Sequence, residues 1–66
     1  MPILYVYAHK KDNVPFMMFS GCPWRWDSEK GELYIWDTPE GVYTFPIKQI
    51  NNTVNDMVFY AYGEVD

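Results

Sequence analysis

A chain of 66 residues suffices for one domain, residues 1–66, which buries only about 60% of the surface of its unfolded state and needs support beyond an ordinary core. Its single cysteine excludes an internal disulfide, and one cysteine with one histidine argues against a structural zinc site. A net charge of −4 argues against free nucleic acid and acidic membranes as ligands, because the field of the protein repels phosphate groups.

Residues 3–8 form a continuous apolar run rich in β-branched and aromatic side chains, which predicts the first strand. No basic segment precedes this run, and it is too short for a signal peptide or a membrane span, so a cytoplasmic protein is expected. The polar residues 9–13 predict a loop. Residues 16–19 predict a second strand, because Pro15 and Gly21 leave no room for a helix between them.

The next segment carries Trp24 and Trp26 on either side of Arg25. In an extended chain both indole rings project to one side and Arg25 projects to the other. A turn follows, so residues 24–27 are expected to pair with residues 32–36. This pairing predicts a three-stranded meander together with the hairpin that comes next.

The stretch 31–47 organises the chain, because two runs rich in aromatic and β-branched residues flank the sequence Thr38-Pro39-Glu40-Gly41. Proline presets φ at the second position of a type I turn, and a glycine accepts the left-handed conformation after it. The segment therefore predicts a β-hairpin with Thr38 opposite Val42 and Leu33 opposite Ile47.

Alternation along this hairpin assigns its side chains to two faces. The predicted core face carries Leu33, Ile35, Tyr43, Phe45 and Ile47. The opposite face carries Tyr34, Trp36, Val42, Thr44 and Pro46. That second face is too apolar for solvent alone, and another copy of the chain is the cheapest cover for it, so a homodimer is predicted. The alternative is a monomeric barrel in which the first and last strands cover the face.

Residues 48–56 are polar with isolated apolar residues and predict a loop with a short 3₁₀ turn. Residues 57–62 predict the last strand, which is apolar on both faces like the first, and such strands usually lie centrally or close a barrel. Five or six strands predict an all-β fold. An SH3-like barrel is the first choice, and an open antiparallel sheet that pairs with a second copy is the alternative.

Catalysis is not expected, because His9 and Cys22 are the only base and thiol of the chain and carry no local signature of a triad. The dispersed glycines form no phosphate-binding loop, and the carboxylates are scattered polar turn residues. No metal or cofactor is therefore predicted.

The remaining functional signal is aromatic, since tryptophan, tyrosine and arginine dominate binding hot spots. The predicted anchors for a partner are Trp24, Arg25, Trp26, Tyr34 and Trp36. The predicted rim charges are the loop acids Asp27, Glu29, Asp37 and Glu40. The alternative for each ring is that it fills the core of a small domain.

Small acidic β proteins without catalytic residues resemble, in a general way, virus-encoded or regulatory inhibitors that block the surface of a larger partner. The resemblance implies a non-enzymatic protein-binding module, and the acidity of this chain favours a partner with a basic or apolar surface. The second hypothesis is a small-ligand or nucleotide-binding domain that stacks a ring on these aromatics. It ranks lower because Arg25 and Lys30 are the only nearby groups that neutralise phosphate.

Overall fold

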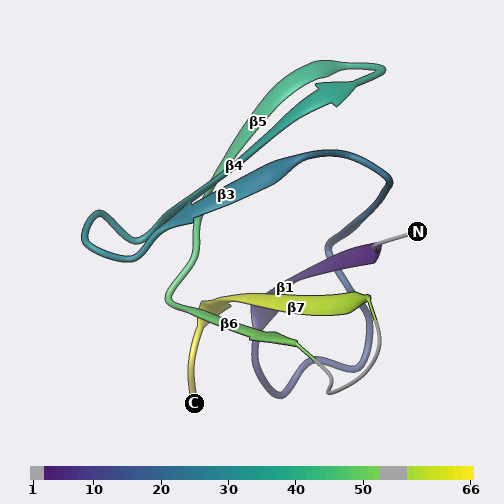
Figure 1. Ribbon diagram of the computed structural model, residues 1–66. Helices are drawn as coiled ribbons and strands as arrows, with labels where there is room; N and C mark the ends of the chain where they lie inside the picture. Colours follow the sequence, from purple (N-terminus) through teal and green to yellow (C-terminus); the bar gives the residue numbers. More distant parts are fainter. Residues whose placement is uncertain (1–2, 53–56) are drawn as a thin grey trace.

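The computed structural model describes residues 3–52 and 57–66, which form two stacked β-sheets (Figure 1). The first sheet has four strands in the order β2-β1-β7-β6. Its strands are β1 (Ile3–His9), β2 (Met17–Ser20), β6 (Gln49–Asn52) and β7 (Val58–Glu64). The second sheet has the order β3-β4-β5, and its strands are β3 (Trp24–Asp27), β4 (Glu32–Thr38) and β5 (Gly41–Pro46). The described residues are therefore all-β and contain no helix.

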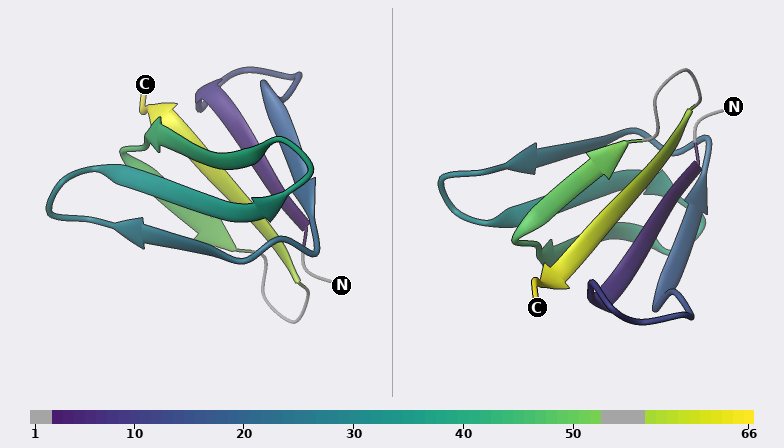
Figure 2. Two further views of the ribbon diagram at one scale, coloured as in Figure 1. Left: turned by 90° about the horizontal axis from the view of Figure 1, so that it is seen from above. Right: turned by 90° about the horizontal axis from the view of Figure 1, so that it is seen from below.

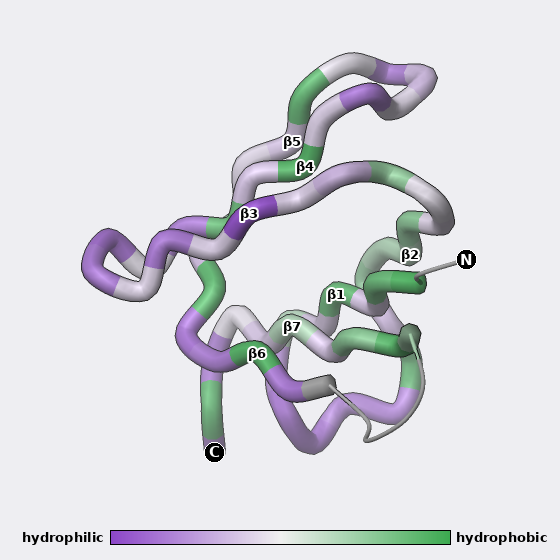
Figure 3. The backbone as a smooth tube through the Cα atoms, in the orientation of Figure 1, coloured by the Kyte–Doolittle hydropathy of each residue, from purple (hydrophilic) through white to green (hydrophobic). Residues whose placement is uncertain are grey.

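The core lies between the two sheets, which Figure 2 shows one above the other. Alternate residues of each strand face this space, as the pleat of a strand requires. The buried side chains are Leu4, Val6, Phe19, Leu33, Ile35, Ile47 and Ala61. Half-buried rings extend the core to its margins, among them Trp24, Trp26, Tyr43, Phe45 and Phe59. Hydrophilic residues gather in the connecting turns (Figure 3). Aromatic packing thus supplies the support that so short a chain needs.

The first and last strands lie side by side in the middle of the four-stranded sheet, which is one of the two positions expected for strands that are apolar on both faces, the other being closure of a barrel. They pair in parallel, with Leu4 beside Phe59 and Val6 beside Ala61. The expectation of a purely antiparallel sheet is therefore wrong for this pair. A parallel pair needs a long connection, and the meander of the second sheet lies within that connection.

The strand count exceeds the predicted five or six, because β6 occupies part of the segment that was expected to be a loop. Ile50 packs against the core from β6, while Gln49 and Asn51 pair with Tyr62 and Tyr60 of β7. The expected 3₁₀ turn falls partly on residues 53–56, which lie outside the described residues. Between the two sheets of the described chain no strand ladder is formed, so the predicted barrel is not closed.

The hairpin forms where predicted, but its register differs by two residues. Thr38 pairs with Gly41, and β4 carries an extra residue between Ile35 and Thr38. This bulge contains Asp37, whose φ of 57° lies in the left-handed region, while Gly41 has the expected positive φ of 105°. Because the shift is even, every side chain keeps its predicted face. The pairs are now Leu33 with Phe45, Tyr34 with Thr44 and Ile35 with Tyr43.

Candidate functional site

The pairing of β3 with β4 divides the predicted anchors between two sides of one sheet. Trp24 and Trp26 stand opposite Ile35 and Leu33, so their rings face the core and are half-buried against it. The ring of Trp24 meets that of Phe59 edge-on at 5.0 Å. The indole Nε1 of Trp26 donates a hydrogen bond to the carbonyl oxygen of Ile47 at 3.1 Å. These two rings join the sheets.

The other three anchors lie on the outer side of the same sheet. Arg25 pairs with Tyr34, whose hydroxyl donates a hydrogen bond to Glu32 Oε1 at 2.8 Å. Trp36 is 40% exposed, and Val42 across the bulge is 70% exposed. Nothing in the described chain stacks these residues into one platform with Trp24 and Trp26, because the sheet itself separates the two groups.

Two of the four predicted rim acids accept hydrogen bonds beside the turns of the meander. The carboxylate of Asp27 accepts hydrogen bonds from the backbone N–H groups of Glu29 (3.1 Å) and Lys30 (3.2 Å), which shapes the β3–β4 turn. Glu40 accepts a hydrogen bond from the hydroxyl of Tyr43 at 3.2 Å. The side chains of Glu29 and Asp37 are exposed. Glu29 and Glu40 lie in turns, as predicted for all four, whereas Asp27 ends β3 and Asp37 lies in the bulge of β4.

The different roles of Trp26 and Trp36 lead to a testable difference in stability. Replacing Trp26 by phenylalanine is expected to lower the free energy of unfolding by about 1–2 kcal/mol, because it removes indole packing and the hydrogen bond to Ile47. Replacing the more exposed Trp36 by phenylalanine is expected to change it by less than about 0.5 kcal/mol. Urea denaturation followed by circular dichroism measures both values, and equal losses would contradict the placement of Trp26.

A second aromatic surface covers the outer side of the four-stranded sheet, and we call it the tyrosine face. Its residues alternate with the buried ones along each strand, and no described element packs over them (Figure 2, right). The tyrosine face consists of Ile3, Tyr5 and Tyr7 of β1, Met18 and Ser20 of β2, Gln49 and Asn51 of β6, and Val58, Tyr60 and Tyr62 of β7. None of these residues is among the anchors or rim charges predicted from the sequence.

Four tyrosine rings form the centre of this face. The parallel register sets Tyr5 beside Tyr60 and Tyr7 beside Tyr62. The first pair stacks at 5.7 Å between ring centroids with 16° between planes, and the second at 5.6 Å with 27°. Tyr7 and Tyr60 link the two pairs at 6.3 Å. Each of the four rings thus packs against at least one neighbour, and stacked or tilted pairs of this kind stabilise one another.

As far as Tyr7 and Tyr62 the tyrosine face carries no charged residue, although the protein as a whole has a net charge of −4. The next residues on the same side are His9 and Glu64, which pair at the ends of β1 and β7. Met18 is 58% exposed beside Tyr5, and the amide of Gln49 donates a hydrogen bond to Asn51 Oδ1 at 3.1 Å on the opposite edge. Protein interfaces are depleted in charge at their centres and enriched in tyrosine and methionine. This composition is typical of a contact surface.

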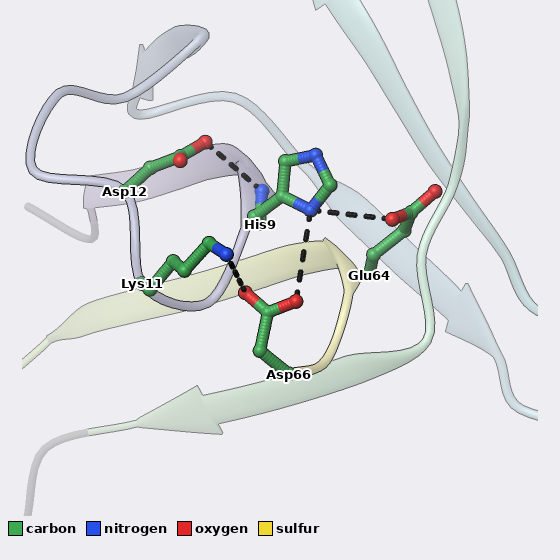
Figure 4. A network of polar contacts seen from close by, with 5 residues as sticks. All are labelled: His9, Lys11, Asp12, Glu64 and Asp66. Carbon is green, nitrogen blue, oxygen red and sulfur yellow. Dashed lines mark hydrogen bonds and ion pairs between the residues drawn. The ribbon is translucent and has the colours of Figure 1, made fainter.

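Charged groups begin where the tyrosine face ends, at the carboxyl ends of β1 and β7 (Figure 4). His9 Nδ1 lies 3.2 Å from Glu64 Oε2 and 4.0 Å from Asp66 Oδ1, and the ammonium of Lys11 lies 3.8 Å from Asp66. The backbone N–H of His9 donates to Asp12 Oδ2 at 3.0 Å. This network joins the chain end to the β1–β2 loop.

The raised pKa of Tyr7, which lies on the tyrosine face, predicts that the protein loses stability at alkaline pH. Partial burial raises the pKa of Tyr7 above its ordinary value of 10.0, and the nearby phenols of Tyr60 and Tyr62 raise it further. Since the folded protein holds this proton more tightly than the unfolded chain, the contribution is fully present below about pH 10 and is lost as the pH rises through the folded-state pKa.

Tyr7→Phe is therefore expected to lose less stability than the unmodified protein between pH 8 and about pH 11. Urea midpoints at the two pH values measure the difference. An identical decline in both proteins would contradict the raised pKa of Tyr7.

Among residues 3–52 and 57–66 no cluster of histidine, cysteine and acidic side chains could hold a metal ion. The same residues include no helix of the length and apolarity needed to cross a membrane. Comparison with family models, curated proteins and solved structures finds no match to this chain. The case for a function therefore rests on the surfaces themselves.

Proposed function

We propose that this protein is a non-enzymatic protein-binding module and that the tyrosine face is its contact surface. The observation that supports the proposal is an uncharged, aromatic sheet face on a strongly acidic protein. An exposed sheet face ordinarily carries charge, as the outer side of β3 does with Arg25, whereas the tyrosine face carries none between Ile3 and Tyr7 or between Val58 and Tyr62. Large exposed apolar surfaces of this kind typically mark sites where another molecule binds.

Tyrosine suits this role because it presents a large amphipathic area at a low cost in side-chain entropy. Stacking of Tyr5 on Tyr60 and of Tyr7 on Tyr62 lowers that cost further, since the rings are already ordered in the free protein. Met18 adds an adaptable apolar group at the β2 edge. The free hydroxyl ends of the rings supply hydrogen bonds to the partner.

The partner proposed is a larger protein with an apolar patch and basic groups around it. The apolar patch matches the tyrosine face, and the basic groups match the acidity of the whole chain, which speeds encounter and favours the right orientation. The mode of action proposed is occlusion, in which this small acidic regulator or inhibitor covers a working surface of its target.

The test compares two charge insertions, one on each outer face of the sandwich. Tyr60→Arg places a charge at the centre of the tyrosine face, and Val42→Arg places one on the exposed outer side of β5. In affinity capture from extracts of the source cells, Tyr60→Arg is expected to weaken recovery of the partner by about tenfold or more. Val42→Arg is expected to leave it unchanged. Circular dichroism and melting curves confirm that both variants fold.

The reverse pattern, with binding lost only in Val42→Arg, would move the contact surface to the side of Trp36 and Tyr34. Loss in neither variant would remove both outer faces from the proposal. The remaining alternative is that a second copy of the chain, rather than another protein, covers one of these faces. Sedimentation equilibrium reports it directly, because a mass that stays at 7.9 kDa across micromolar concentrations rules out the predicted homodimer.

A further inference from the structure

A cleft of about 430 Å³ opens at the end of the sandwich where β1 and β7 finish, and of the tyrosine face only Tyr7 lines it. Its volume falls within the range of about 300–1,000 Å³ that small-molecule sites occupy. The lining combines buried core residues, an exposed aromatic ring and two charged side chains. The proposed protein-binding role makes no use of this cleft.

The floor and one wall of the cleft are apolar. Val6 and Ile47 line it from the core, and Phe16 stands at its edge with 67% of its surface exposed. The ring of Phe16 meets Phe45 edge-on, with centroids 6.2 Å apart and planes at 84°. The backbone N–H of Phe16 donates to the carbonyl oxygen of Val6 at 2.6 Å, which holds this exposed ring in place.

Gly63 lies at the base of the cleft, where the two sheets approach closely. A Cβ atom at this position would lie 3.1 Å from the carbonyl oxygen of Ala8 and 3.3 Å from that of Pro46. Both oxygens belong to the backbone and have little freedom to move away. The absence of a side chain at residue 63 therefore allows the walls of the cleft to come together.

Two opposite charges line the same opening. Lys48 is held beside the end of β7 by the hydrogen bond from its backbone N–H to Tyr62 O at 2.8 Å, and its ammonium forms no ion pair within the described residues. Glu64 directs Oε2 toward His9 Nδ1 at 3.2 Å, whereas its Oε1 has no partner in the described part of the chain. One cation and one carboxylate oxygen thus remain available at the mouth of an apolar cleft.

We propose that this cleft binds a free apolar α-amino acid, of which phenylalanine is the type ligand. The side chain would occupy the space beside Phe16 and Phe45, the ammonium group would meet Glu64, and the carboxylate would meet Lys48. A zwitterion matches a rim that carries both signs of charge, whereas a ligand with one charge leaves one of the two rim groups unused. The site shares only Tyr7 with the tyrosine face, and Tyr60 at the centre of that face does not line it.

The test is an NMR titration of ¹⁵N-labelled protein with L-phenylalanine, for which a dissociation constant of about 1 mM is expected for so small and open a site. Amide shifts are expected at Ala8, Ile47 and Gly63. Phenethylamine lacks the carboxylate and 3-phenylpropionate lacks the ammonium group, and each is expected to bind about fivefold more weakly, as for the loss of one exposed ion pair. N-acetylphenylalanine amide lacks both charges and is expected to bind most weakly.

Two exposed substitutions probe the wall and the rim without disturbing the core. Phe16→Ala and Lys48→Gln are each expected to weaken phenylalanine binding about fivefold. Val14→Ala, two residues from Phe16 and 75% exposed, and Lys30→Gln in the β3–β4 turn are matched controls expected to have no effect.

Absence of shifts at about 10 mM ligand, or equal binding of all four compounds, would overturn the proposal. Shifts confined to the tyrosine face would also overturn it. Tyr60→Arg is expected to leave phenylalanine binding unchanged, which separates this result from the test of protein binding.

Discussion

Leu33→Ala is expected to leave the protein largely unfolded at 37 °C. Leu33 is fully buried near the start of β4, between Trp26 on one neighbouring strand and Phe45 on the other. Truncating a buried leucine costs about 3–5 kcal/mol, because the cavity it leaves closes only in part. A chain of this length has a total stability of roughly 3–10 kcal/mol, so the loss removes most of it.

Urea denaturation followed by tryptophan fluorescence measures this loss in Leu33→Ala. Val42→Ala is the matched control, because Val42 lies on the neighbouring strand and is 70% exposed, and its effect is expected to stay within about 0.5 kcal/mol. A loss below about 1 kcal/mol for Leu33→Ala would show that the two sheets do not close over β4 as described.

Gly63→Val is expected to lower the free energy of unfolding by about 2–3 kcal/mol, and Gly63→Ala by about 1 kcal/mol. The reason is steric, since the added Cβ would meet the carbonyl oxygens of Ala8 and Pro46 at 3.1 and 3.3 Å. The branched side chain of valine adds further atoms in the same confined space. To relieve the overlap, β7 must move away from Ala8 of β1 and Pro46 of β5, which widens the cleft.

Thermal melting resolves this graded series, because 1 kcal/mol shifts the melting temperature of a domain of this size by about 4–8 °C. Thr44→Val, an exposed position on β5, is the control for introducing valine into a strand and is expected to change little. Equal melting temperatures for the glycine and valine proteins would contradict the close approach at Gly63.

Local pattern determined much of the fold. The alternation of Leu33 and Ile35 with polar or aromatic neighbours assigned the inner face of β4 correctly, even though the register was wrong. A register error of two residues preserves the faces, because side chains repeat with a period of two along a strand. The bulge that caused the error depends on Asp37 accepting a φ of 57°, which no sequence pattern signals reliably.

The candidate site depended on contacts between distant parts of the chain. The sequence shows Tyr5 and Tyr7 in one run and Tyr60 and Tyr62 in another, each spaced to share a strand face. Only the parallel pairing of β1 with β7 joins them into one strip. The signal was present in each run, but it remained incomplete until the two runs were known to be neighbours.

What the sequence by itself determined is the all-β class and the meander of residues 24–46, because each follows from local alternation and turn chemistry. What only the tertiary structure decided is which side of each strand is covered. Trp24 and Trp26 share one side, as their spacing requires, and packing of the four-stranded sheet made that side the core. The same packing left the four rings of the tyrosine face outside, because a two-layer sandwich covers one face of each sheet and exposes the other.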